Sequence, residues 1–80
     1  MKELVSYIVK SIVEFPDQVV ITERNDEEGK ILELRVAESD LGKVIGKKGR
    51  TAKSIRSILG AAAGRKGEKA GLDIVETVNK

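Results

Sequence analysis

The sequence of 80 residues contains no cysteine and no histidine. A thiol nucleophile, a disulfide and an imidazole base are therefore excluded, and a zinc site is not expected because these residues are its usual ligands. One tyrosine, one phenylalanine and no tryptophan are present. So few aromatic side chains weigh against a nucleic-acid surface on which bases stack on aromatic rings, as in an RRM.

Long apolar runs are also missing. Charged residues, among them Lys10 and Glu14, interrupt the apolar N-terminal segment, and no stretch approaches the roughly 18 apolar residues of a membrane span. Leu, Ile, Val and Phe nevertheless make up 24 of the 80 residues, well above the level of about 20% below which chains become disordered. We expect one compact cytoplasmic domain, residues 1–80, with an aliphatic core and no membrane segment.

The charges are distributed unevenly along the chain. Residues 1–42 carry five basic and ten acidic side chains, whereas residues 43–56 carry six basic side chains and no acidic one. The net charge of +2 hides this local basic cluster, which is typical of a nucleic-acid footprint. Its members are Lys43, Lys47, Lys48, Arg50, Lys53 and Arg56.

Apolar periodicity predicts the elements of the first half of the chain. Residues 3–15 have helical spacing, and Pro16 should end that helix. Residues 18–25 and 30–38 alternate as strands, with Leu32, Leu34 and Val36 facing inward, and form an antiparallel hairpin around a moderately long acidic loop, residues 26–29.

The second half should contain two helices and a strand. Ser39 or Asp40 can cap a short helix that stops at Gly46, and a longer helix follows Gly49 and is capped near Gly64. Residues 72–78 are predicted to form the last strand, parallel to strand 30–38 because a helical crossover joins them. The expected fold is α+β, in the order α-β-β-α-α-β, with a three-stranded mixed sheet covered by helices on one face.

The stretch "VIGKKGRTAKSI", residues 44–55, brings glycine and positive charge together. Glycine permits a positive φ and leaves no side chain to hold a ligand away. The turn leads into a helix N-terminus, where unpaired N–H groups favour an anion. Arg50 and Lys53 in the first turns oppose the helix dipole, a conflict that an external phosphate would remove. A surface turn with solvated lysines is the alternative, and a lone G-x-x-G would favour it.

This stretch resembles the signature loop of the KH domain, and the element order is that of the type II form. A chain of one such domain is similar to the small bacterial KH-domain RNA-binding proteins of the KhpA type, and the resemblance covers nearly all of the residues. It implies that the loop clamps the backbone of about four single-stranded nucleotides while the bases lie on an aliphatic groove. Ala52 departs from the pattern, because many KH domains have Ile or Leu there, and this shrinks one wall of the groove.

The resemblance assigns roles to residues of this chain. Phosphate contacts are expected on this analogy from Gly46, Lys47, Lys48 and Gly49. The basic run without acids adds Arg50 beside them, and Lys53 and Arg56 further along the helix either contact phosphate or form a solvated face. Val44 and Ile45, with Ile55, would form the groove floor or the core beneath it. The loop before the last strand, residues 64–71, would form the opposite lip, with Arg65, Lys66 and Lys69 as further contacts or as a solvated surface.

The resemblance also bears on partners. It implies self-association, or pairing with a larger KH-containing protein of the Jag type, in an RNA chaperone or post-transcriptional regulator. The small residues from Gly60 to Gly64 could support such an interface, although packing against the protein's own sheet is the favoured interpretation. No cofactor is expected.

Two other classes of function stay open, and an enzyme is not expected. The loop fails the Walker pattern, since Leu41 and Lys48 stand where Gly and Ser or Thr are required. A helix-hairpin-helix DNA binder also holds phosphates at glycine-rich turns, and a preference for duplex DNA would favour it. A protein-interaction adaptor with an unused groove is the third possibility.

Overall fold

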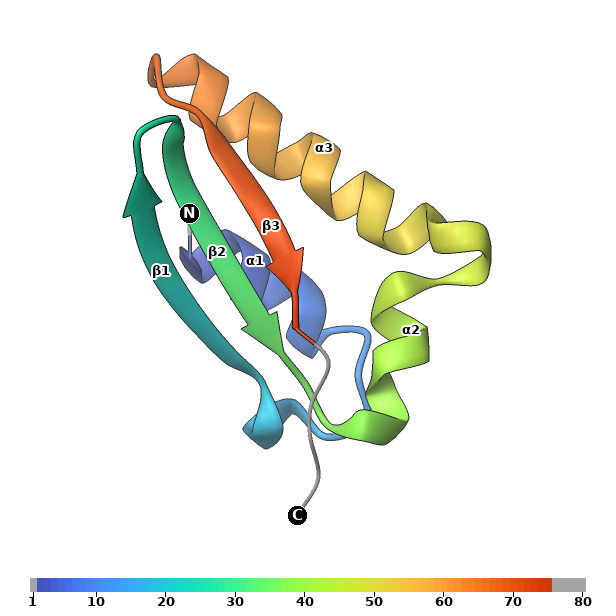
Figure 1. Ribbon diagram of the computed structural model, residues 1–80. Helices are drawn as coiled ribbons and strands as arrows, with labels where there is room; N and C mark the ends of the chain where they lie inside the picture. Colours follow the sequence, from blue (N-terminus) through green and yellow to red (C-terminus); the bar gives the residue numbers. More distant parts are fainter. Residues whose placement is uncertain (1, 76–80) are drawn as a thin grey trace.

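The structure, a computed structural model, describes residues 2–75 and has the predicted α+β architecture. One face of a three-stranded sheet is covered by helices, as Figure 1 shows. The helices are α1 (Lys2–Lys10), α2 (Leu41–Ile45) and α3 (Arg50–Arg65); the strands are β1 (Val20–Asp26), β2 (Gly29–Arg35) and β3 (Ala70–Ile74); the 3-10 turns are η1 (Pro16–Gln18), η2 (Glu38–Asp40) and η3 (Lys47–Gly49).

The sheet has the order β1-β2-β3, with β1 antiparallel and β3 parallel to β2. The predicted parallel pair is therefore confirmed. The hairpin loop is shorter than expected, because Asp26 pairs with Gly29 and only two residues turn the chain. The Asp26 carboxylate accepts hydrogen bonds from the N–H groups of Glu28 and Gly29, which closes this tight turn.

The core lies between the sheet and the helices. The predicted inward positions of β2 and the segment after it are buried, as are apolar residues of α1, α2 and α3. Because alternate strand residues point to opposite faces, Glu33 and Arg35 are directed away from this core. The buried cluster consists of Val5, Val9, Ile21, Leu32, Leu34, Val36, Val44, Ile55, Leu59 and Leu72.

Several predicted boundaries were wrong, and strand β2 ends at Arg35 rather than at residue 38. Helix α1 ends at Lys10 rather than before Pro16. The backbone N–H groups that follow it donate hydrogen bonds to Asp40, as described below. Helix α3 continues past Gly64 to Arg65, and Gly67, with a φ of 71°, is the left-handed glycine after it. Strand β3 begins earlier than expected, at Ala70, and the predicted strand residues 76–78 lie outside the described ones.

The small residues near the end of α3 divide between two environments. Ala63 is buried in the core, whereas Gly60, Ala61 and Gly64 are exposed. Packing against the protein's own sheet therefore accounts for only part of this stretch. Among residues 2–75, no helix has the length and apolar character needed to cross a membrane.

Candidate nucleic-acid interface

The G-K-K-G loop connects α2 to α3 at one end of the molecule, at the right of Figure 1. Two residues of this turn have left-handed backbone conformations, Lys48 with a φ of 57° and Gly49 with a φ of 74°. The loop is closed by a hydrogen bond of 3.0 Å from the Gly49 N–H to the Gly46 carbonyl. Both lysine side chains are exposed, so the loop is accessible to a ligand.

Gly46 cannot be replaced without a change in the loop. Its backbone has a φ of 79° and a ψ of 171°, a region that is almost restricted to glycine. A Cβ atom at this position would lie 2.2 Å from Thr51 Oγ1 and 2.8 Å from the Thr51 backbone nitrogen. The close approach of the loop to the start of α3 therefore requires glycine here.

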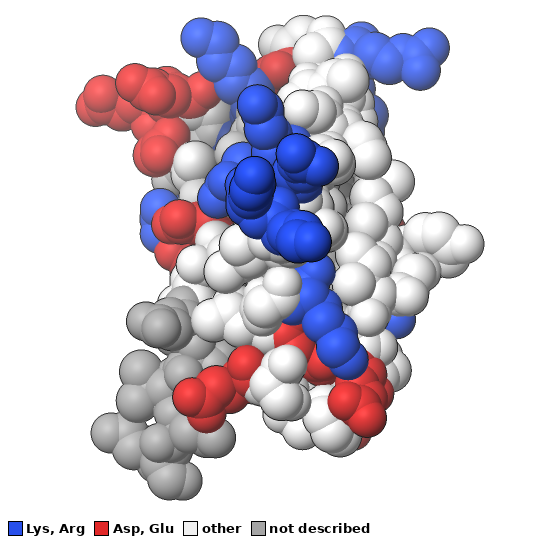
Figure 2. All heavy atoms as spheres, turned by 90° about the vertical axis from the view of Figure 1, so that its right-hand side faces the viewer, with Lys and Arg blue, Asp and Glu red and all other residues white. Residues whose placement is uncertain are grey.

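Helix α3 begins directly after this loop without a side-chain cap. In the described part of the chain, Gly49 occupies the cap position and no side chain caps the first N–H groups of the helix. Such groups carry partial positive charge and attract anions. Exposed basic side chains surround them, as the cluster of Lys and Arg in Figure 2 shows. They are Lys47, Lys48, Arg50, Lys53 and Arg56.

An open apolar groove of about 330 Å³ adjoins the loop. Residues from α2, α3 and β3 line it together with Gly49. Ala52, the small residue noted in the sequence, forms part of one wall. The complete lining is Leu41, Ile45, Gly49, Ala52, Arg56 and Ile74.

The structure separates the aliphatic residues that were expected near the groove. Ile45 is 38% exposed and lines it, whereas Val44 and Ile55 are buried in the core. Val44 therefore supports α2 from beneath and is not a contact residue, which corrects its inclusion in the predicted site. Leu41 and Ile74 were missed as lining residues, because their apolar character indicated only core positions.

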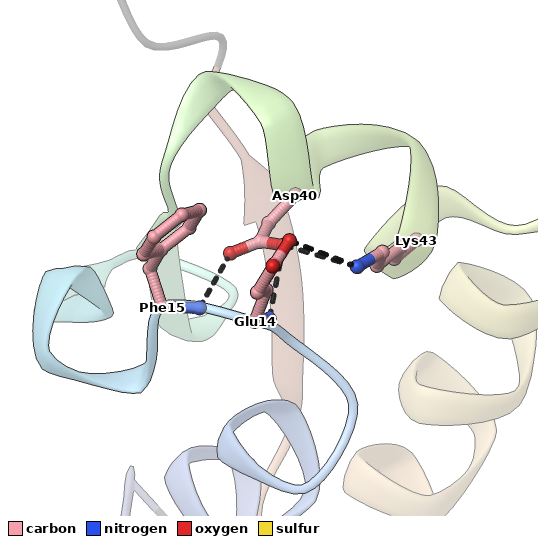
Figure 3. A network of polar contacts seen from close by, with 4 residues as sticks. All are labelled: Glu14, Phe15, Asp40 and Lys43. Atoms are coloured by element: carbon pink, nitrogen blue, oxygen red, sulfur yellow. Dashed lines mark hydrogen bonds and ion pairs between the residues drawn. The ribbon is translucent and has the colours of Figure 1, made fainter.

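Lys43 forms ion pairs with two acidic side chains, so its charge does not add to that of the basic cluster. Its ammonium nitrogen lies 3.6 Å from a Glu14 carboxylate oxygen and 3.7 Å from Asp40 Oδ1, as Figure 3 shows. These contacts neutralise a charge that the sequence pattern counts toward the footprint. The free positive charge near the loop is smaller than the count over residues 43–56 indicates.

Asp40 does not cap α2, contrary to the expectation, and no capping bond from its side chain is made. Instead its buried carboxylate accepts hydrogen bonds of 3.0 Å from the N–H groups of Glu14 and Phe15 (Figure 3). This explains why α1 ends early, since these N–H groups are held by Asp40 rather than by the helix. The same bonds fix the position of the segment that carries α2 and the loop.

The pKa of Asp40 reflects this arrangement. Burial alone would raise the pKa of the carboxyl group. The N–H groups of Glu14 and Phe15 and the charge of Lys43 act in the opposite direction and hold the pKa below its ordinary value of 3.8. Asp40 is therefore a charged, fully hydrogen-bonded structural residue.

Residues 64–71 do not form the opposite lip of the groove. They lie at the far end of α3, next to the start of β3 (Figure 1). A helix of 16 residues spans about 24 Å, so Arg65, Lys66 and Lys69 are well removed from the G-K-K-G loop. The expectation was wrong because β3 itself, with Ile74, forms the wall opposite α2.

The family model of the KhpA/KhpB KH domain matches residues 2–74. This chain belongs to that KH-domain family. It is 47% identical over 75 residues to the RNA-binding protein KhpA of Clostridium acetobutylicum and 49% identical over 75 residues to that of Clostridium perfringens, covering 94% of this chain and 100% of each relative. It is also 45% identical over 74 residues to the RNA-binding protein KhpA of Borreliella burgdorferi, covering 92% of this chain and 90% of the relative.

Membership in this KH family agrees with the resemblance carried by the loop. The helix-hairpin-helix interpretation of the loop rested on local sequence alone, and it does not account for the strands β2 and β3 that flank the two helices. In a KH domain the G-x-x-G loop clamps the nucleotide backbone, and in this chain the loop adjoins a groove that α2, α3 and β3 line together.

Proposed function

We propose that this protein is a single KH domain, residues 1–80, that binds single-stranded RNA at the G-K-K-G loop. The observation that supports this most is the position of an exposed, basic, glycine-containing loop directly beside an open apolar groove. Phosphates would lie against the loop and the start of α3, and bases would lie over Ile45 and Ala52. Relatives named RNA-binding protein KhpA support the choice of RNA.

Within this site, each predicted group has a distinct task. Gly46 and Gly49 bring the backbone close to the phosphates, and Lys47, Lys48 and Arg50 supply positive charge around them. Lys53 extends the positive surface along α3. The protein acts by binding rather than by catalysis, and no cofactor takes part.

A double charge reversal in the loop tests this proposal. Lys47→Asp combined with Lys48→Asp should weaken RNA binding by about a hundredfold or more, because two cations become anions beside the phosphates. Thermal unfolding should change little, since both side chains are exposed. Binding is measured by fluorescence anisotropy with a labelled single-stranded RNA.

A matched control carries the same change in net charge elsewhere. Lys2→Asp with Lys10→Asp places the charges at the two ends of α1, where the favourable and unfavourable dipole effects offset each other. This variant should bind RNA nearly as well as the original protein. Equal loss in both variants, or no loss in the loop variant, would refute the assigned site. Stronger binding of duplex DNA would favour the helix-hairpin-helix type of function, and no nucleic-acid binding would favour an adaptor.

We further propose that the protein works in the bacterial cytoplasm as an RNA chaperone or post-transcriptional regulator with a partner. The partner would be a second copy or a larger KH-containing protein of the Jag type. One short groove offers few contacts, and two linked modules gain affinity through a high effective concentration. The exposed surface of α3 at Ile58, Ala61 and Gly64 supports such pairing.

A further inference from the structure

Arg56 occupies a special position in the groove. It follows Gly49 and Ala52 along one face of α3, since residues spaced by three and four positions share a helix face. The other described residues that line the groove are apolar or glycine, so Arg56 supplies its charge. None of them is aromatic. The guanidinium of Arg56 is thus the planar group that the groove offers to a base.

The side chain of Arg56 is also held in place. Its Nε–H donates a hydrogen bond of 3.2 Å to the backbone carbonyl of Leu72. Leu72 belongs to β3, an edge strand of the sheet whose outer backbone groups pair with no other strand among residues 2–75. The bond therefore ties α3 to β3 across the groove. It uses Nε and leaves the two terminal amino groups of the guanidinium for a ligand.

We propose that Arg56 contacts RNA bases, whereas Lys47, Lys48, Arg50 and Lys53 contact phosphates. The G-K-K-G loop holds the backbone at the groove entrance, and the bases that enter the groove meet the fixed guanidinium. A planar donor group can stack on a base or donate to its acceptor edge, and guanine offers the O6 and N7 pair that suits it best. This inference rests on the proposed RNA binding.

Arg56→Lys tests the role of the planar group. The lysine keeps the positive charge and can still donate to the Leu72 carbonyl, but it lacks the planar fork. Binding is compared for a short mixed-sequence single-stranded RNA and for the same strand with its bases removed. We expect Arg56→Lys to weaken binding of the complete RNA by about fivefold or more and to leave binding of the abasic strand unchanged. A melting curve checks that the variant is folded.

Lys53→Gln is the matched control, because Lys53 is exposed on the same helix three positions earlier. It should weaken the complete and the abasic strand by the same factor, as a phosphate contact does. Equal effects of Arg56→Lys on both strands, or no effect on either, would overturn the base-contact role while the proposed function stands. If the unaltered protein binds neither strand, the proposed function fails and this inference falls with it.

Discussion

At the scale of single residues, two positions of the loop stand out. Gly46 requires glycine, whereas Lys48 has a left-handed backbone conformation that glycine adopts more easily. Lys48 has a φ of 57°, which costs a residue with a side chain about 1 kcal/mol or more. A glycine there would relieve that strain. In the proposed function, the lysine there supplies an ammonium group that a glycine would lack.

Gly46→Ala should lower the free energy of unfolding by about 1–3 kcal/mol and distort the loop, because the new Cβ meets Thr51 at a forbidden φ. Chemical denaturation measures the stability, and RNA anisotropy measures the binding. Gly49→Ala is the control. Its φ is also positive, but its Cβ would meet nothing within 4 Å, so the loss should be smaller. A larger loss for Gly49→Ala would contradict this account of the loop.

At the scale of elements, Asp40 connects the end of α1 with the start of α2. Asp40→Asn keeps the shape of the side chain but removes the charge that the two N–H groups and Lys43 contact. The variant should therefore melt at a lower temperature than the original protein at pH 7. Thermal unfolding followed by circular dichroism measures this difference.

The difference in stability between the original protein and Asp40→Asn should also depend on pH. The pKa of Asp40 is lowered in the folded protein, so its charge stabilises the fold above the ordinary pKa of 3.8 and loses that effect as the pH falls through the folded pKa. The stability difference between the original protein and Asp40→Asn should shrink in that acid range. Glu27→Gln at the exposed hairpin turn is the control and should show no such convergence. A difference that stays constant at low pH would refute the role of the charge.

Sequence patterns predict the helices and strands well where the spacing of apolar residues fits only one type of element. The alternation of Leu32, Leu34 and Val36 predicted the correct inward face of the second strand. Gly46 and Gly49 predicted the turn between α2 and α3. The pattern could not reveal the bonds of Asp40, since its partners lie 25 and 26 positions away along the chain. The contact of Lys43 with the distant Glu14 and the remote position of residues 64–71 likewise required the folded chain.

At the scale of the whole molecule, the proposed interface uses four basic side chains near the phosphates. Lys43 contacts acids, and Arg56 is assigned to bases. With Lys47, Lys48, Arg50 and Lys53 as contacts, the logarithm of the affinity should fall against the logarithm of salt concentration with a slope of about −3. A salt titration followed by anisotropy measures this slope.

Binding of two copies of the protein to one RNA molecule would change the slope of the salt dependence. Two modules double the number of phosphate contacts and predict a slope of about −6 on a longer RNA. Sedimentation of the same complex reports its mass and separates the two cases. A slope near zero would contradict a phosphate-based interface in either form.

The tie between Asp40 and the backbone at Glu14 and Phe15 also limits how the chain can be shortened. A fragment starting at Val20 would retain every residue of the groove and the loop. In such a fragment, however, the buried Asp40 carboxylate would lack its two N–H donors. The core residues that now pack against Val5 and Val9 would be exposed to water. The segment before Val20 thus holds the part of the chain that carries the basic loop in position, and the smallest autonomous RNA-binding fragment should include it.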